Sequence, residues 1–130
     1  MAVIRFENGF HGTYCIQDQT LKIGHEWIQP YDMTFGAVAS CFYATFLGVL
    51  NEHGITVRSA EVTVDGRKRT KVPTTLEYLK LTLKPESEAS REELEACMNE
   101  ALGKCSMVAT VKAVAQVEAE LVLPERKPGQ

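Results

Sequence analysis

The sequence predicts an α+β fold in which strand hairpins are combined with a long buried helix. Residues 2–24 alternate apolar and polar side chains around turn signals, and residues 35–50 form a largely apolar run. Residues 90–123 then give two helical segments and an alternating strand. Because the strands come in hairpins rather than as β-α-β units, the class is α+β rather than α/β.

The N-terminal section is expected to form three short strands followed by a loop. Asn8-Gly9 is the strongest short hairpin signal, and the segment that follows it returns as the second strand. Cys15 lies in that second strand and is interpreted as a small packing residue with a hidden sulfur. The three strands are expected at residues 2–7, 10–17 and 21–24, and the loop at 25–34.

The central helix is expected to begin near Asp32 or Thr34, either of which can cap it, because Pro30 interrupts a helix. It should run to about His53, with Gly54 as the residue after its end. The segment is apolar around most of its circumference, so a second subunit is the simplest cover for it. The apolar run is too short and too internal to be a membrane span.

The second half is expected to contain a hairpin, two helices and a last strand. Ser90 and Glu93 form a capping box, and Cys97 lies on the apolar stripe of the helix that they open. We expect one domain over residues 1–124 and a flexible tail at 125–130. The elements are expected at 55–66 and 72–85 (strands), 90–103 and 104–111 (helices) and 113–123 (strand).

Composition limits the function classes. The chain has 130 residues and a net charge of −3, which argues against a nucleic-acid partner. No secretory signal opens the sequence, so the four cysteines are expected to be thiols in a reducing cytoplasm. The three histidines have no metal-ligand spacing and no nucleotide-binding motif is found, so neither a metal nor a cofactor is expected.

Two cysteines lie where a thiol can be activated. Cys41 is in the first half of the central helix, where the helix dipole favours a thiolate. Cys105 follows Lys104 at the start of a short helix, where a cation and exposed amides can lower a thiol pKa. Because 64 residues separate the two, spacing alone favours two unrelated core thiols.

The order of elements and the residues around both cysteines resemble the OsmC/Ohr family of thiol-dependent hydroperoxide reductases. The stretch QPYDMTFGAVASCF is similar to a family motif in which a proline opens the central helix eleven residues before the peroxidatic cysteine, and Pro30 and Cys41 have that spacing. GKCSMVATV resembles a second motif, a resolving cysteine at the start of a short helix. The resemblance covers residues 2–123.

The resemblance implies a specific chemistry. Cys41 would attack an organic hydroperoxide and become a sulfenic acid, which Cys105 would resolve as a disulfide. A dithiol, lipoyl-linked or a small thiol, would reduce the pair. The fold would be an intertwined homodimer with the two central helices packed together and the sites at the interface.

The chain also departs from the family pattern around the thiolate. The peroxidase branch has Glu after the proline where this chain has Tyr31, while Asp32 matches a Glu of the broader family. The branch holds its thiolate with an early Arg, for which Arg5 is a poor fit and His11 a candidate substitute. Two other interpretations remain open: a homodimer of this fold that binds an apolar small molecule without turnover, and a thiol redox sensor.

Overall fold

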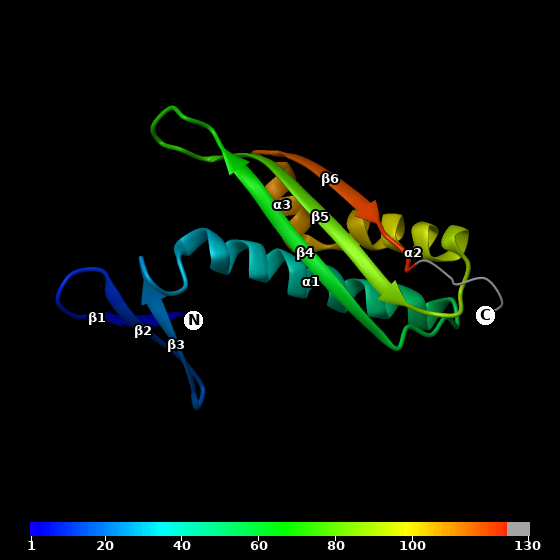
Figure 1. The fold of residues 1–130 in the computed structure, drawn as a ribbon, viewed down its shortest axis with the longest axis horizontal. Helices are drawn as coiled ribbons and strands as arrows, with labels where there is room; N and C mark the ends of the chain where they lie inside the picture. Colours follow the sequence, from blue (N-terminus) through cyan, green and yellow to red (C-terminus); the bar gives the residue numbers. More distant parts are fainter. Residues whose placement is uncertain (125–130) are drawn as a thin grey trace. The chain divides into compact units, whose positions relative to one another are not determined.

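The computed structural model describes residues 1–124, which form β1-β2-β3-α1-β4-β5-α2-α3-β6 in chain order (Figure 1). The chain divides into two compact units, one from Met1 to Gly36 and one from Ala37 onward. Separate sheets and helices in one chain confirm the predicted α+β class. The predicted tail at 125–130 lies outside the described residues, and the single domain over 1–124 stays a prediction.

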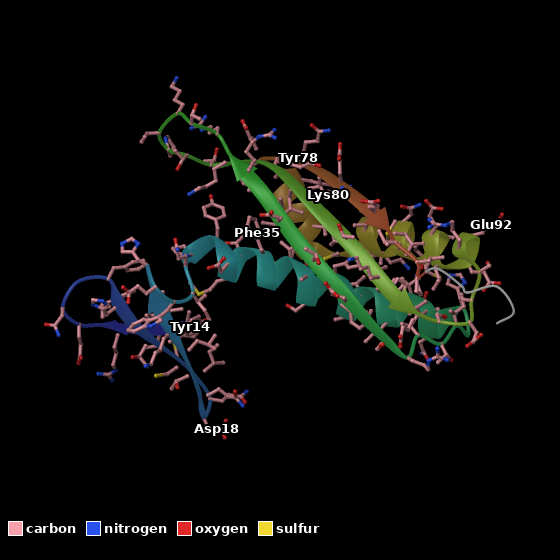
Figure 2. All side chains as sticks on the ribbon, viewed as in Figure 1. Tyr14, Asp18, Phe35, Tyr78, Lys80 and Glu92 are labelled. Atoms are coloured by element: carbon pink, nitrogen blue, oxygen red, sulfur yellow. The ribbon has the colours of Figure 1, made fainter. Side chains whose placement is uncertain are left out.

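The N-terminal unit holds an antiparallel sheet in the order β1-β2-β3, as the sequence predicted. Asn8 and Gly9 have φ values of 51° and 92° in the first turn, which is why the Asn-Gly pair is suited to it. The second turn comes earlier than expected, with Gln17 at φ 55° and Asp18 at the hairpin tip (Figure 2). The strands are β1 (Val3–Phe6), β2 (His11–Ile16) and β3 (Gln19–Gly24).

The long helix α1 (Pro30–Glu52) begins earlier than predicted. Pro30 itself is its first residue, a position where the missing N–H of proline costs nothing. The carboxylate of Asp32 accepts a hydrogen bond from the Gln29 N–H at 2.9 Å. The start near Asp32 or Thr34 was therefore predicted too late, whereas the family motif, in which a proline opens this helix, matches the observed start. Asp32 does cap this end, but from inside the first turn.

The end of α1 follows the predicted glycine stop. Gly54 has a φ of 67°, in the left-handed region that favours glycine. The Ile55 N–H donates to the Leu50 carbonyl at 2.9 Å, and the Gly54 N–H donates to the Asn51 carbonyl at 3.3 Å. These two bonds form a Schellman motif, which satisfies the last carbonyls of the helix.

One stripe of α1 is buried in the single chain, and the predicted cover of its other apolar side chains by a second subunit stays a prediction. Val38, Phe42 and Phe46 are fully buried, whereas Leu47 is 45% exposed. By length and apolar composition alone α1 could cross a bilayer, because the helix extends beyond the apolar run at 35–50 that was predicted to be too short. Core helices of soluble proteins pass the same test, so it is weak evidence for a membrane span.

The second sheet has the order β4-β5-β6, with β4 antiparallel to β5 and β5 parallel to β6. The expectation of hairpins alone was therefore wrong for the last strand. Two helices between β5 and β6 carry the chain back to the same end of the sheet, which a parallel pair requires. The strands are β4 (Ser59–Lys68), β5 (Leu76–Glu86) and β6 (Gln116–Leu121).

Two helices, α2 (Arg91–Lys104) and α3 (Ser106–Lys112), lie on the same side of this sheet in Figure 1. The Ser90 hydroxyl accepts a hydrogen bond from the Glu93 N–H at 3.2 Å, so the predicted helix cap is confirmed. The inner face of β5 is apolar and has no exposed surface at Leu79, Leu81 and Leu83. Its outer face is polar: Tyr78 donates to Glu118 at 2.7 Å and Lys80 pairs with Glu120 at 2.9 Å (Figure 2).

Candidate active site

The structure brings Cys41 of α1 and Cys105 of the α2–α3 junction together. Their sulfur atoms are 3.4 Å apart, and the Cys105 thiol donates toward the Cys41 sulfur. Both residues belong to the C-terminal unit. Cys105 is the single residue between α2 and α3 and caps the end of one helix and the start of the other. The interpretation of two unrelated core thiols, which spacing alone favoured, is therefore wrong.

The pKa of Cys41 is lowered from the ordinary thiol value by neutral hydrogen-bond donors. The Met107 N–H has the largest effect, followed by the Ser106 hydroxyl and the Cys105 thiol. The Ser106 oxygen is 3.6 Å from the Cys41 sulfur. The sequence attributed the activation to the start of α1, but the donors come from the start of α3, which the fold alone brings to Cys41.

The pKa of Cys105 is shifted in the opposite direction, upward. Burial raises the pKa of its thiol above the ordinary value, and the nearby Cys41 sulfur raises it further, although backbone N–H groups at the start of α3 oppose the shift. Lys104 is directed elsewhere, toward Glu100 at 3.3 Å and Glu52 at 3.8 Å. The backbone N–H groups at the helix start therefore lower the pKa of Cys105 as expected, but burial outweighs them, and the expected contribution of Lys104 was wrong.

The other two cysteines differ from each other. Cys97 is 3% exposed within α2, and burial raises the pKa of its thiol, in agreement with its predicted packing role. Cys15 is exposed on β2, so the prediction that its sulfur is hidden was wrong. The sheet to which Cys15 belongs has only three strands, and nothing in the N-terminal unit covers this residue.

The four candidate supporting residues all lie in the N-terminal unit. Arg5 is exposed on β1 opposite Thr13. The His11 Nδ1 is 2.9 Å from the Asn8 carbonyl, which requires this nitrogen to donate. The ring of Tyr31 lies 5.9 Å from that of Phe35.

These contacts fix the local positions of Arg5, His11 and Tyr31, and Asp32 is bound to the Gln29 N–H as described above. Any role that they have toward Cys41 stays a prediction. Sequence reasoning missed Ser106 and Met107 as neighbours of Cys41. The one sequence feature that could have pointed to Ser106 is its position directly after Cys105. Residues 1–124 contain no cluster of His, Cys, Asp and Glu suited to a metal ion.

The family model for OsmC-like proteins matches residues 24–120, a span that contains both cysteines and most of the fold. The chain belongs to the OsmC-like family. No curated protein matches the OsmC-like chain by sequence. Solved structures of other proteins share its fold. Their sequence identities to this chain are so low that the likeness shows the fold alone.

Three relatives illustrate the agreement. An OsmC-like protein from Mycoplasma pneumoniae has a TM-score of 0.86 at 15% identity, with 96% of each chain covered. A hypothetical protein from Aquifex aeolicus has a TM-score of 0.86 at 15% identity, covering 98% of this chain and 97% of its own. The organic hydroperoxide resistance protein OhrB of Bacillus subtilis has a TM-score of 0.74 at 16% identity, covering 94% and 98%.

Proposed function

We propose that this OsmC-like protein is a thiol-dependent peroxidase that reduces organic hydroperoxides. The observation that carries the proposal is the pair formed by Cys41 and Cys105, whose sulfurs lie 3.4 Å apart. Their pKa values shift in opposite directions, so one thiol is suited to attack as a thiolate and the other to remain protonated until needed.

In the first step, the Cys41 thiolate attacks the distal oxygen of the hydroperoxide. A sulfur–oxygen bond forms while the oxygen–oxygen bond breaks, and the leaving alkoxide takes a proton to become an alcohol. Cys41 is thereby oxidised by two electrons to a sulfenic acid, and the peroxide is reduced. Its partial exposure gives the substrate access, which the 1% exposed Cys105 does not offer.

In the second step, Cys105 attacks the sulfenic sulfur of Cys41. A disulfide bond forms, the sulfur–oxygen bond breaks, and hydroxide leaves as water with the proton of the Cys105 thiol. The oxidised pair is returned to two thiols by a dithiol, lipoyl-linked or a small thiol, which becomes a disulfide itself. The reaction takes place in the cytoplasm, where such reductants keep thiols reduced.

The protein acts as a homodimer in this proposal. In the N-terminal unit, all of which is described, Ile23 is the one buried apolar side chain, while Phe6, Leu21 and Trp27 are 52%, 41% and 41% exposed. A three-stranded sheet with so little core needs another surface to be stable. On α1, Leu47 and a stripe of small exposed residues, Ser40, Ala44 and Gly48, leave room for a second copy of the helix.

The test is the consumption of cumene hydroperoxide in the presence of dihydrolipoamide. We expect wild-type turnover, and none with Cys41→Ser. Cys105→Ser should give at most one turnover, because its Cys41 sulfenic acid has no resolving partner. Cys97→Ser is the matched control. It should retain activity, since Cys97 is buried within α2 and takes no part in the proposed reaction. Wild-type protein that consumes no peroxide and keeps all its thiols would contradict the proposal and favour a non-catalytic binding module.

A further inference from the structure

The structure assigns Ser106 a catalytic role: its hydroxyl donates a hydrogen bond to the Cys41 thiolate and holds the sulfur in its reactive, ionised form. This inference rests on the proposed peroxidase function, because the role matters only if Cys41 is the nucleophile. The contact itself is independent of that function. The Ser106 oxygen is 3.6 Å from the Cys41 sulfur, within the longer range of hydrogen bonds to sulfur.

The direction of the bond follows from the chemistry of the two groups. A thiolate carries no proton and accepts only, so the hydroxyl must be the donor once Cys41 is ionised. A donor to an ionised acceptor forms the stronger kind of hydrogen bond. The bond therefore favours the thiolate over the thiol, and the Ser106 hydroxyl is among the groups that lower the pKa of Cys41.

Three other hydroxyls, two on α1 beside Cys41 and one on α3, donate their hydrogen bonds to backbone carbonyls. Ser40 donates to the Ala37 carbonyl at 3.2 Å, and Thr45 donates to the Cys41 carbonyl at 2.9 Å. Thr110, one turn along α3, donates to the Ser106 carbonyl at 2.9 Å. These bonds stay within their own helices, whereas the Ser106 hydroxyl crosses from α3 to the sulfur on α1.

Uncharged donors carry the whole effect among the residues that the structure describes. The pKa of Cys41 is lowered by the Met107 and Ser106 N–H groups, the Ser106 hydroxyl and the Cys105 thiol, and no Lys, Arg or His contributes. Ser106 supplies two of these four donors, one from its side chain and one from its backbone. A substitution at this one position therefore removes up to half of them.

The test is the pH dependence of Cys41 alkylation by iodoacetamide, followed by peptide mass mapping in the full-length protein so that only Cys41 is scored. For Ser106→Ala, which keeps the backbone N–H, we expect the midpoint to rise by about 0.5 to 1 unit. Removing a hydrogen bond to a charged group that is sheltered from water would move the midpoint by roughly 1 to 2 pH units. The expected rise is smaller because Ser106 is exposed to water. Ser106→Thr keeps the hydroxyl and should restore the midpoint.

Ser106→Pro extends the series by removing the N–H as well as the hydroxyl. The site accepts proline, because Ser106 is the first residue of α3 and Cys105 before it has φ −75° and ψ 119°, the conformation that precedes proline comfortably. We expect a larger rise than in Ser106→Ala. Ser40→Ala is the matched control: it deletes a hydroxyl beside Cys41 that does not reach the sulfur, and it should leave the midpoint unchanged.

The outcomes separate this inference from the proposed function. A midpoint equal to wild type in both Ser106→Ala and Ser106→Pro overturns the inference, whatever the peroxidase activity. An equal rise in Ser40→Ala also overturns it, because the effect would then be a general disturbance of α1. If wild type consumes no peroxide but the graded shifts occur, the proposed function fails while the hydrogen bond to the thiolate is supported. If both hold, peroxide consumption at neutral pH should fall about 3- to 10-fold in Ser106→Ala, following the loss of thiolate.

Discussion

Ala44 offers a sharp test of the homodimer, because its environment differs completely between one chain and two. In the single chain Ala44 is exposed on α1, one turn from both Ser40 and Gly48. A lysine there would extend into water and change the free energy of unfolding by no more than about 0.5 kcal/mol. If a second copy of α1 packs on this stripe, the same lysine lies in an apolar interface.

The size of the effect follows from the cost of an unpaired charge. Leaving one uncompensated charge buried costs about 3–5 kcal/mol. The flexible stem of lysine can carry its head group toward water, so we take the lower end, about 3 kcal/mol. At about 1.4 kcal/mol for each factor of ten, this weakens dimerisation by at least about 100-fold. Two-fold symmetry places a second copy of the substitution in the same interface, which adds to the loss.

Sedimentation equilibrium across a range of protein concentrations measures this change directly. Ala96→Lys is the matched control: it makes the same replacement at an exposed alanine of α2, where Glu92 and Glu100 lie one turn away on either side and favour a lysine. We expect wild type and Ala96→Lys to be dimers at micromolar concentration, and Ala44→Lys to dissociate. A wild-type monomer would overturn the homodimer, and an Ala44→Lys dimer as tight as wild type would show that this stripe is not its interface.

Three further outcomes are expected. Phe42→Ala should lower the free energy of unfolding by about 3–5 kcal/mol, measured by urea denaturation, because Phe42 is 0% exposed; no loss would contradict its place in the core. Ser90→Ala should cost about 1 kcal/mol in the same assay, because it removes the acceptor for the Glu93 N–H, and Ser90→Asp should restore it. Alkylation of Cys41 should reach half its maximal rate at a lower pH than alkylation of Cys97, since the two pKa values shift in opposite directions; a reversed order would contradict this.

Much of the fold was predictable because its signals are local. Asn8-Gly9 marks a turn through the φ preferences of two residues, Gly54 marks a helix end in the same way, and Ser90 marks a helix start through one hydrogen bond. The parallel pairing of β5 and β6 was missed because alternation reveals a strand but not the direction of its partner. Local signals placed the start of α1 too late because Pro30 was taken as an obstacle, although proline is well suited to the first position of a helix. Only the family motif, in which a proline opens this helix, predicted the observed start.

The candidate site was predictable only in part. Both cysteines carried sequence signals, but their 3.4 Å approach depends on where α3 begins relative to α1, which no spacing rule gives. The same is true of Ser106, whose hydroxyl matters only because the fold carries it to Cys41. Burial was also misjudged: Cys15 was expected to be hidden because strands usually have a covered face, yet it is exposed in the single chain.

Peptide mass mapping after one equivalent of cumene hydroperoxide shows whether Cys41 and Cys105 form one redox pair. The free thiols are blocked in acid with a first reagent, and the disulfide is then reduced and labelled with a second. We expect the second label on Cys41 and Cys105 together, with Cys15 and Cys97 carrying the first. A disulfide that joins Cys41 to any other cysteine, or a Cys41 that is oxidised while Cys105 stays free, would contradict it.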